Sequence, residues 1–117
     1  MSTHFIDTLY RKKPVRVVMG YDRILNYFHL KIQHLDMKNV PGDRLPIIYS
    51  SASDPNMFSF EVEDCREILK RRRIKVPQSM LKAVYDDGVK RVGNYAVQHF
   101  ADGSKKVLLP KQRNRRR

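Results

Sequence analysis

Apolar and polar residues alternate along two neighbouring stretches in the first third of the chain. In the first stretch, Val15, Val17 and Met19 share one side of an extended backbone. Residues 28–33 alternate in the same way. This period of two predicts an antiparallel pair of strands, joined through residues 21–26, with one face on the core and one facing solvent.

The segments between the regular elements are rich in turn-forming residues. In the first connection, Asp22 and Arg23 predict an Asx turn, and Gly20 just before them is expected to supply an unusual backbone angle. Residues 37–46 and 50–56 are predicted loops, because Asn, Pro, Gly, Asp and Ser are concentrated there.

Residues 1–13 do not continue the alternation. Their apolar residues fall in two pairs, Phe5-Ile6 and Leu9-Tyr10, a spacing that fits a short helical turn. The segment is therefore interpreted as an N-terminal arm or short helix, outside a single domain that spans residues 14–110.

In the middle of the chain the period changes to that of a helix. The apolar stripe of residues 61–73 includes Cys65, which is therefore expected in the core. The acidic residues of this segment come first and its basic residues last, an order that favours a helix through its macrodipole. Pro77 suits the start of a second helix over residues 78–87, and Gly88 is the expected stop.

Three further strands complete the predicted sheet. Residues 46–49 form a short third strand, and residues 92–100 and 105–109 flank an Asp-Gly turn, which is a strong hairpin signal. The resulting order β-β-β-α-α-β-β predicts an α+β fold, an antiparallel sheet with two helices on one face.

The chain carries a large excess of positive charge. The chain of 117 residues has 24 Lys and Arg against 12 Asp and Glu, a net charge of +12. Residues 105–117 contain no acid, and residues 111–117 have no apolar anchor, so this basic tail is expected to be disordered when free. A surplus of this size indicates a polyanionic partner rather than a particular fold.

The same composition narrows the class of protein. A single cysteine excludes an intramolecular disulfide and favours a reducing compartment. No stretch approaches the roughly 20 apolar residues of a membrane-spanning helix, and the first residues lack the apolar region of a signal peptide. We therefore expect a cytoplasmic protein without a membrane partner.

Three basic clusters and one mixed sheet face are the candidate nucleic-acid contacts, chiefly through phosphates. The clusters are Arg11, Lys12, Lys13 and Arg16 near the start of the sheet, Lys70, Arg71, Arg72, Arg73 and Lys75 at the first helix, and Lys111, Arg113, Arg115, Arg116 and Arg117 in the tail. Tyr27, His29 and Lys31 join Arg16 on the predicted wet face of the sheet, where bases would stack. Dipole compensation explains the helix cluster equally well, and exposed Tyr and His are common on sheets that bind nothing.

Two other functions stay open beside a non-enzymatic protein that binds DNA or RNA. The basic surface also suits an acidic protein surface, as in a regulator encoded by a mobile element or phage. A small metal-independent ribonuclease would use His29 or His99 as acid or base.

Asp86 and Asp87, which oppose the dipole of the second helix, are interpreted as a capping and turn feature. No motif or spacing predicts a metal, a cofactor or a catalytic residue.

Overall fold

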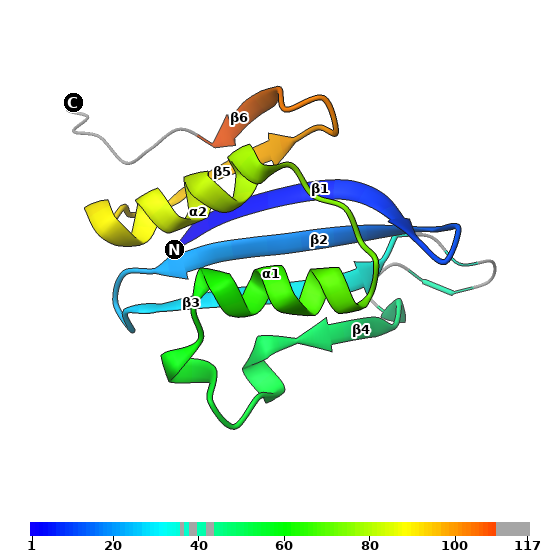
Figure 1. The fold of residues 1–117 in the computed structure, drawn as a ribbon, viewed down its shortest axis with the longest axis horizontal. Helices are drawn as coiled ribbons and strands as arrows, with labels where there is room; N and C mark the ends of the chain where they lie inside the picture. The colour runs from blue at the N-terminus through cyan, green and yellow to red at the C-terminus, as the bar shows by residue number, and fades with distance from the viewer. Residues whose placement is uncertain (36, 38–39, 42–43, 110–117) are drawn as a thin grey trace.

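The structure, a computed structural model, describes residues 1–35, 37, 40–41 and 44–109. Figure 1 shows a sheet with two helices crossing one of its faces. The strands are β1 (Ser2–Tyr10), β2 (Lys13–Asp22), β3 (Tyr27–His34), β4 (Ile47–Ser50), β5 (Tyr95–His99) and β6 (Lys105–Leu109), and the helices are α1 (Val62–Arg71) and α2 (Gln78–Lys90).

The sheet has six strands in the order β4-β3-β2-β1-β5-β6. β1 pairs with β5 in parallel, with Ser2 opposite Tyr95 and Ile6 opposite His99, whereas the other neighbouring strands are antiparallel. The α+β class is confirmed, and the prediction of a wholly antiparallel sheet is wrong. The parallel pair arises because the two helices separate β1 from β5 along the chain.

The interpretation of residues 1–13 as an arm or short helix is also wrong. Residues 2–10 form β1, which lies between β2 and β5, so the domain includes the start of the chain. The three buried positions that begin this strand are Ser2, His4 and Ile6. Because two of them are polar, the strand lacks the apolar alternation that reveals β2 and β3.

The hydrophobic core lies between the helices and the sheet. Val15, Val17 and Met19 from β2 are fully buried and meet Leu30 and Ile32 from β3, as the alternation predicted. Cys65 of α1 is buried in this core as predicted, and burial raises the pKa of its thiol to about 12. At neutral pH this cysteine is therefore a packing residue and not a nucleophile.

The predicted turns are confirmed in part. The Asp22 carboxylate accepts hydrogen bonds of 3.0 Å from the backbone N–H groups of Ile24 and Leu25, which makes the expected Asx turn. Gly20 serves a different purpose from the one predicted. It lies within β2, where a Cβ atom would stand 1.9 Å from the Ser2 carbonyl oxygen and 2.7 Å from His29 Nε2.

Gly88 does not end the second helix. α2 continues to Lys90 and closes at Arg91, whose φ of 51° is left-handed. A Cβ atom on Gly88 would lie 2.4 Å from Cζ of Phe28, so this glycine lets the helix approach the ring closely. The sequence predicted that this glycine ends the helix. In the structure the residue is required instead for close packing against Phe28.

We predict that Gly20→Ala destabilises the fold by about 3 kcal/mol, the upper end of the range for an overpacked core, because the new methyl group meets backbone. Gly93→Ala is the control: its Cβ would come no closer than 3.3 Å, to the end of the Arg23 side chain, which can move. Its stability should stay within about 0.5 kcal/mol of the unmodified protein. Chemical denaturation of both variants measures the difference, and equal stabilities would contradict the close approach.

Candidate functional site

Two of the predicted basic clusters meet at one end of the sheet. The β1–β2 turn and the end of α1 together line a pocket of about 640 Å³, formed by Tyr10, Arg11, Arg71, Arg72 and Arg73. We call it the arginine pocket. Its lining contains four guanidinium groups and no carboxylate. Tertiary structure therefore concentrates positive charge that the sequence distributes over two distant segments.

A tight hairpin turn positions the first of these arginines. Tyr10 pairs with Lys13 across β1 and β2, which leaves Arg11 and Lys12 as a two-residue turn. Both have positive φ, 52° and 68°, as a type I′ turn requires. Asn-Gly is the usual pair in such a turn, because side chains other than Asn and Gly are strained there. The guanidinium of Arg11 lies over the Tyr10 ring, 5.2 Å from its centroid.

The end of α1 positions the other three arginines of the pocket, Arg71, Arg72 and Arg73. The Arg73 N–H bonds the Lys70 carbonyl, and the Ile74 N–H bonds the Leu69 carbonyl, both at 3.0 Å. This is a Schellman motif, in which Arg73 occupies the left-handed position that glycine usually fills, with a φ of 55°. A non-glycine residue costs about 1 kcal/mol there.

The pocket therefore places cationic side chains on backbone positions that favour glycine or asparagine. The side chains of Arg71 and Arg73 are exposed and have no hydrogen-bond or ion-pair partner within the described part of the chain. Strained backbone and unpartnered charge at one place are typical of a binding site.

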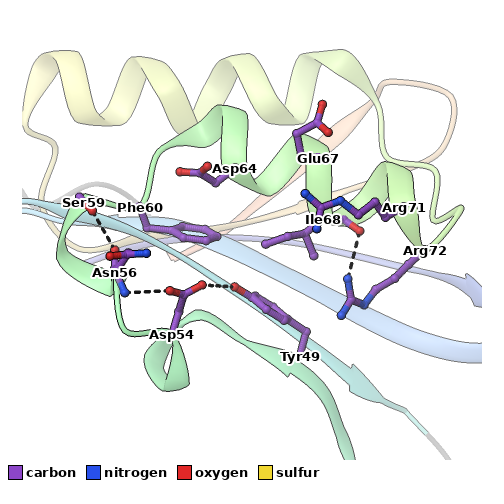
Figure 2. A pocket seen from close by; sticks show the side chains of 10 residues that line it. All are labelled: Tyr49, Asp54, Asn56, Ser59, Phe60, Asp64, Glu67, Ile68, Arg71 and Arg72. Atoms are coloured by element: carbon purple, nitrogen blue, oxygen red, sulfur yellow. Dashed lines mark hydrogen bonds between the residues drawn. The ribbon is translucent and has the colours of Figure 1, made fainter.

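A second cavity shares Arg71 and Arg72 with the arginine pocket and runs along α1 (Figure 2). We call it the α1 groove. Its volume is about 530 Å³, and it is lined by Tyr49, Asp54, Asn56, Ser59, Phe60, Asp64, Glu67, Ile68, Arg71 and Arg72.

Hydrogen bonds hold one wall of the α1 groove. The Tyr49 hydroxyl donates to Asp54 Oδ2 at 3.2 Å, and the backbone N–H of Asn56 donates to Asp54 Oδ1 at 2.8 Å. Burial and the neighbouring Asp54 raise the pKa of Tyr49, which keeps its hydroxyl protonated as a donor. The Arg72 guanidinium lies 5.2 Å from the centroid of the Tyr49 ring. Figure 2 shows this wall facing α1 across Phe60 and Ile68.

Other predicted contacts lie away from the arginine pocket. Arg16 is on the open face of the sheet, where it is held by two hydrogen bonds to Asp7, of 2.6 and 3.0 Å, and stacked on the Phe5 ring. Its charge is therefore largely compensated. The strand register places His29 and Lys31 on this same open face, both half-buried.

The remaining predicted residues do not line the arginine pocket. Tyr27 lies at the start of β3, where its ring centroid is 5.4 Å from that of Phe58 and 6.5 Å from that of His29. Lys12, Lys13, Lys70 and Lys75 are exposed without lining the arginine pocket. Lys111, Arg113, Arg115, Arg116 and Arg117 lie outside the described residues, as does the predicted disordered tail.

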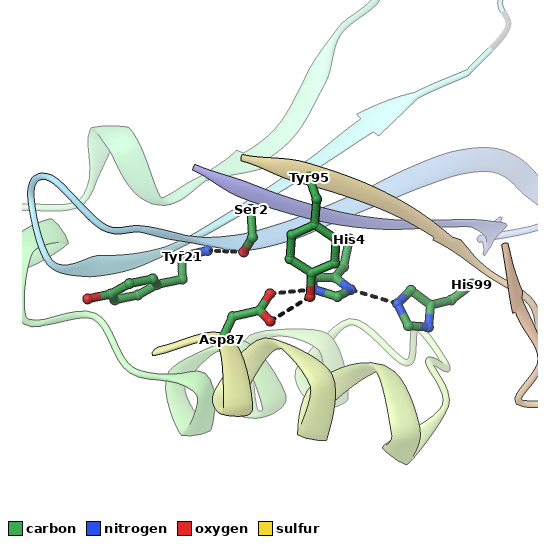
Figure 3. Close-up of polar contacts among 6 residues, drawn as sticks. All are labelled: Ser2, His4, Tyr21, Asp87, Tyr95 and His99. Carbon is green, nitrogen blue, oxygen red and sulfur yellow. Dashed lines mark hydrogen bonds and ion pairs between the residues drawn. The ribbon is translucent and has the colours of Figure 1, made fainter. Parts of the chain in front are cut away.

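A buried polar network joins α2 to β1 and β5 (Figure 3). The Asp87 carboxylate accepts hydrogen bonds from His4 Nε2 at 2.6 Å and from the Tyr95 hydroxyl at 2.5 Å. His4 Nδ1 lies 2.8 Å from His99 Nε2. Each of these four side chains belongs to a residue that is less than a tenth exposed. The interpretation of Asp86 and Asp87 as a capping and turn feature is therefore wrong for Asp87, which faces the sheet.

The network controls the charge of its members. Burial alone would raise the pKa of Asp87, but hydrogen bonds from His4, Tyr95 and Ser2 outweigh it, and the pKa lies below its ordinary value. Burial, with the neighbouring His4 and Lys105, lowers the pKa of His99 to about 4. Asp87 is therefore ionised and His99 neutral at pH 7.

The two histidines named for a ribonuclease are not brought together. The register places His99 on the helix-facing side of the sheet, where it is 2% exposed, and His29 on the open side. None of the major cavities described above reaches the His4–His99 pair. The network therefore links α2 to the sheet through Asp87.

Comparison with known proteins identified no matching family model, curated protein or solved structure. Among the described residues, no helix is long and apolar enough to cross a membrane. Nor does this part of the chain bring three or more His, Cys, Asp or Glu side chains together as a metal site. The candidate site therefore rests on the geometry of the arginine pocket and the α1 groove.

We predict that the protein loses stability as the pH falls from about 6.5 to 4. The unfolded chain protonates His99 with a pKa near 6.5 and the folded protein only near 4, so the unfolded state binds more protons between these values. The loss attributable to His99 should not exceed about 3 kcal/mol.

Two variants test whether His99 causes this loss of stability. His99→Gln should be less stable at pH 7 and should show a shallower decline with falling pH. Tyr95→Phe, which removes a hydrogen bond but no histidine, should also be less stable yet keep the original slope above pH 4. Thermal denaturation across this pH range measures both slopes, and an unchanged slope in His99→Gln would contradict the role of neutral His99.

Proposed function

We propose that this protein binds nucleic acid through phosphate contacts in the arginine pocket. The observation that carries the proposal is the meeting of Arg11 with Arg71, Arg72 and Arg73 around one cavity free of carboxylates. The planar fork of a guanidinium matches two phosphate oxygens, and clustered arginines release condensed counterions from a polyanion.

The electrostatic balance at the pocket supports an anionic ligand. The C-terminus of α1 carries a partial negative charge of about half a unit, which by itself disfavours a phosphate. The four arginines outweigh it, and three of the carbonyls near the end of the helix already accept backbone hydrogen bonds. Leu69 and Lys70 accept the two bonds of the Schellman motif, and Ile68 accepts from the Arg72 N–H.

The exposed lysines beside the pocket extend the same surface. Lys12 and Lys13 adjoin Arg11 in the β1–β2 turn, and Lys70 and Lys75 flank the arginines of α1. The basic tail would add sequence-independent affinity, as its composition predicts. The protein acts as a binding module and not as an enzyme in this proposal, because its histidines do not face the pocket.

Arg73→Gly tests this proposal, since it should stabilise the protein while weakening binding. Glycine relieves the left-handed backbone, which should raise the free energy of unfolding by about 1 kcal/mol. Loss of one phosphate contact should weaken binding about fivefold and reduce the slope of log affinity against log salt by about 0.9 for a duplex. Fluorescence anisotropy with labelled single-stranded RNA, single-stranded DNA and duplex DNA, between about 50 and 200 mM salt, measures these effects.

Arg91→Gly is the matched control. Arg91 is exposed and also has a left-handed φ, of 51°, but it lies at the end of α2 beside Asn26, at the opposite end of the sheet from the β1–β2 turn. The same charge is removed, so binding should remain within about twofold of the unmodified protein. Equal losses in the two variants, or no salt-dependent binding to any nucleic acid, would overturn the proposal and favour an acidic protein as partner.

A further inference from the structure

The α1 groove adjoins the arginine pocket, since Arg71 and Arg72 line both. The two neighbouring cavities differ in the chemistry of their linings. Arg71 and Arg72 lie at one end of the α1 groove and Asp54 and Asp64 lie away from them, while Glu67 stands one helical turn before Arg71 (Figure 2). Each cavity is within the range of about 300–1,000 Å³ that is usual for small-molecule sites.

The groove between these ends offers an apolar surface. Figure 2 shows Phe60 and Ile68 between α1 and the wall formed by Tyr49 and Asp54. Phe60 is buried, and Tyr49 and Ile68 are half-buried, so the groove presents part of two of these side chains to a ligand. Aromatic surface of this kind stacks on unpaired bases.

The carboxylates retain capacity to accept hydrogen bonds. Asp54 accepts from Tyr49 and Asn56, which orients it, and a carboxylate can accept about four hydrogen bonds. Glu67 is exposed and has no hydrogen-bond or ion-pair partner within the residues that the structure describes. These groups repel phosphate and attract N–H donors. A ligand would therefore bind with its anionic end at the arginines and its N–H groups at the carboxylates.

We propose that the α1 groove holds the base of one unpaired nucleotide whose phosphate lies in the arginine pocket, and that the groove selects bases with an exocyclic amino group. This inference rests on the proposed nucleic-acid-binding function and adds its substrate class. A ligand with an anionic end, a flat ring and an N–H-rich edge satisfies the arginines, the apolar surface and the carboxylates in that order.

Two specificities follow from the charge of the groove. Cytosine presents an amino donor at the ring position where uracil presents a carbonyl oxygen, and a carboxylate accepts from the first but repels the second. A paired base is stacked within a duplex and cannot enter the groove without flipping out. The protein should therefore prefer single strands to duplexes, and oligocytidine to oligouridine.

The test compares labelled oligocytidine, oligouridine and an RNA duplex of equal length by fluorescence anisotropy at constant salt. The unmodified protein should bind oligocytidine about tenfold more tightly than oligouridine, which is within the discrimination of a well-placed base contact. The duplex should bind more weakly than oligocytidine.

Asp54→Asn should reduce the preference for cytosine to threefold or less, because an amide also donates a hydrogen bond to the uracil carbonyl. Glu67→Gln provides a second variant, since Glu67 makes no contact that the fold needs, and it should reduce the preference in the same direction. Asp86→Asn is the matched control. It removes the same charge from an ion pair with Lys82 outside the groove and should keep the full preference.

The outcomes separate this inference from the proposed function. Binding that depends on Arg73 but is equal for oligocytidine and oligouridine would overturn the groove as a base site and leave phosphate binding intact. A preference that persists in both Asp54→Asn and Glu67→Gln would overturn the role of the carboxylates. Absence of salt-dependent binding to all three ligands would overturn both proposals.

Discussion

The buried carboxylate of Asp87 is the constraint on which the arrangement of helices and sheet depends. A carboxylate removed from water is tolerated only when it is hydrogen-bonded, and leaving it unpaired costs about 3–5 kcal/mol. Ser2 supplies one hydrogen bond, and His4 from β1 and Tyr95 from β5 supply two more. These two residues reach one carboxylate because β1 and β5 are parallel neighbours beneath α2. The polar network therefore ties α2 to the parallel pair of β1 and β5.

A second constraint acts around the arginine pocket, at the other end of the molecule. Backbone positions there favour glycine or asparagine but carry cationic residues. Three positions around the arginine pocket have left-handed φ values and carry Arg11, Lys12 and Arg73 instead of glycine or asparagine. The apolar contacts of β2, β3 and α1 stabilise the fold enough to maintain these conformations. Strain and repulsion between like charges therefore coincide at this surface, whereas Asn26 and Arg91 have left-handed φ values at the opposite end of the sheet. A coincidence of strain with repulsion is expected where binding, and not folding, determines the residue.

The segregation of charge along α1 connects these features to the proposed ligand. Acidic residues begin the helix and basic residues end it, an order that stabilises any isolated helix through its dipole. Once α1 lies on the sheet near β4, the same order becomes the polarity of a groove, which runs from Asp64 through Glu67 to Arg71 and Arg72. One pattern in the sequence therefore serves both local stability and the direction in which a nucleotide would bind.

Elements whose pattern is local can be predicted from the amino-acid sequence without the structure. These are the alternating strands β2 and β3, the amphipathic α1 with Cys65 in the core, the Asx turn at Asp22, the hairpin between β5 and β6, and the excess of positive charge. The sequence could not reveal β1, because the buried side of that strand begins with Ser2 and His4, whose partners come from the far end of the chain. Nor could it show that Arg11 meets Arg73 while Arg16 is neutralised by Asp7. Periodicity and turn chemistry are properties of neighbouring residues, whereas a pocket or a buried ion is defined by contacts between distant ones, and only the tertiary structure decides which distant residues meet.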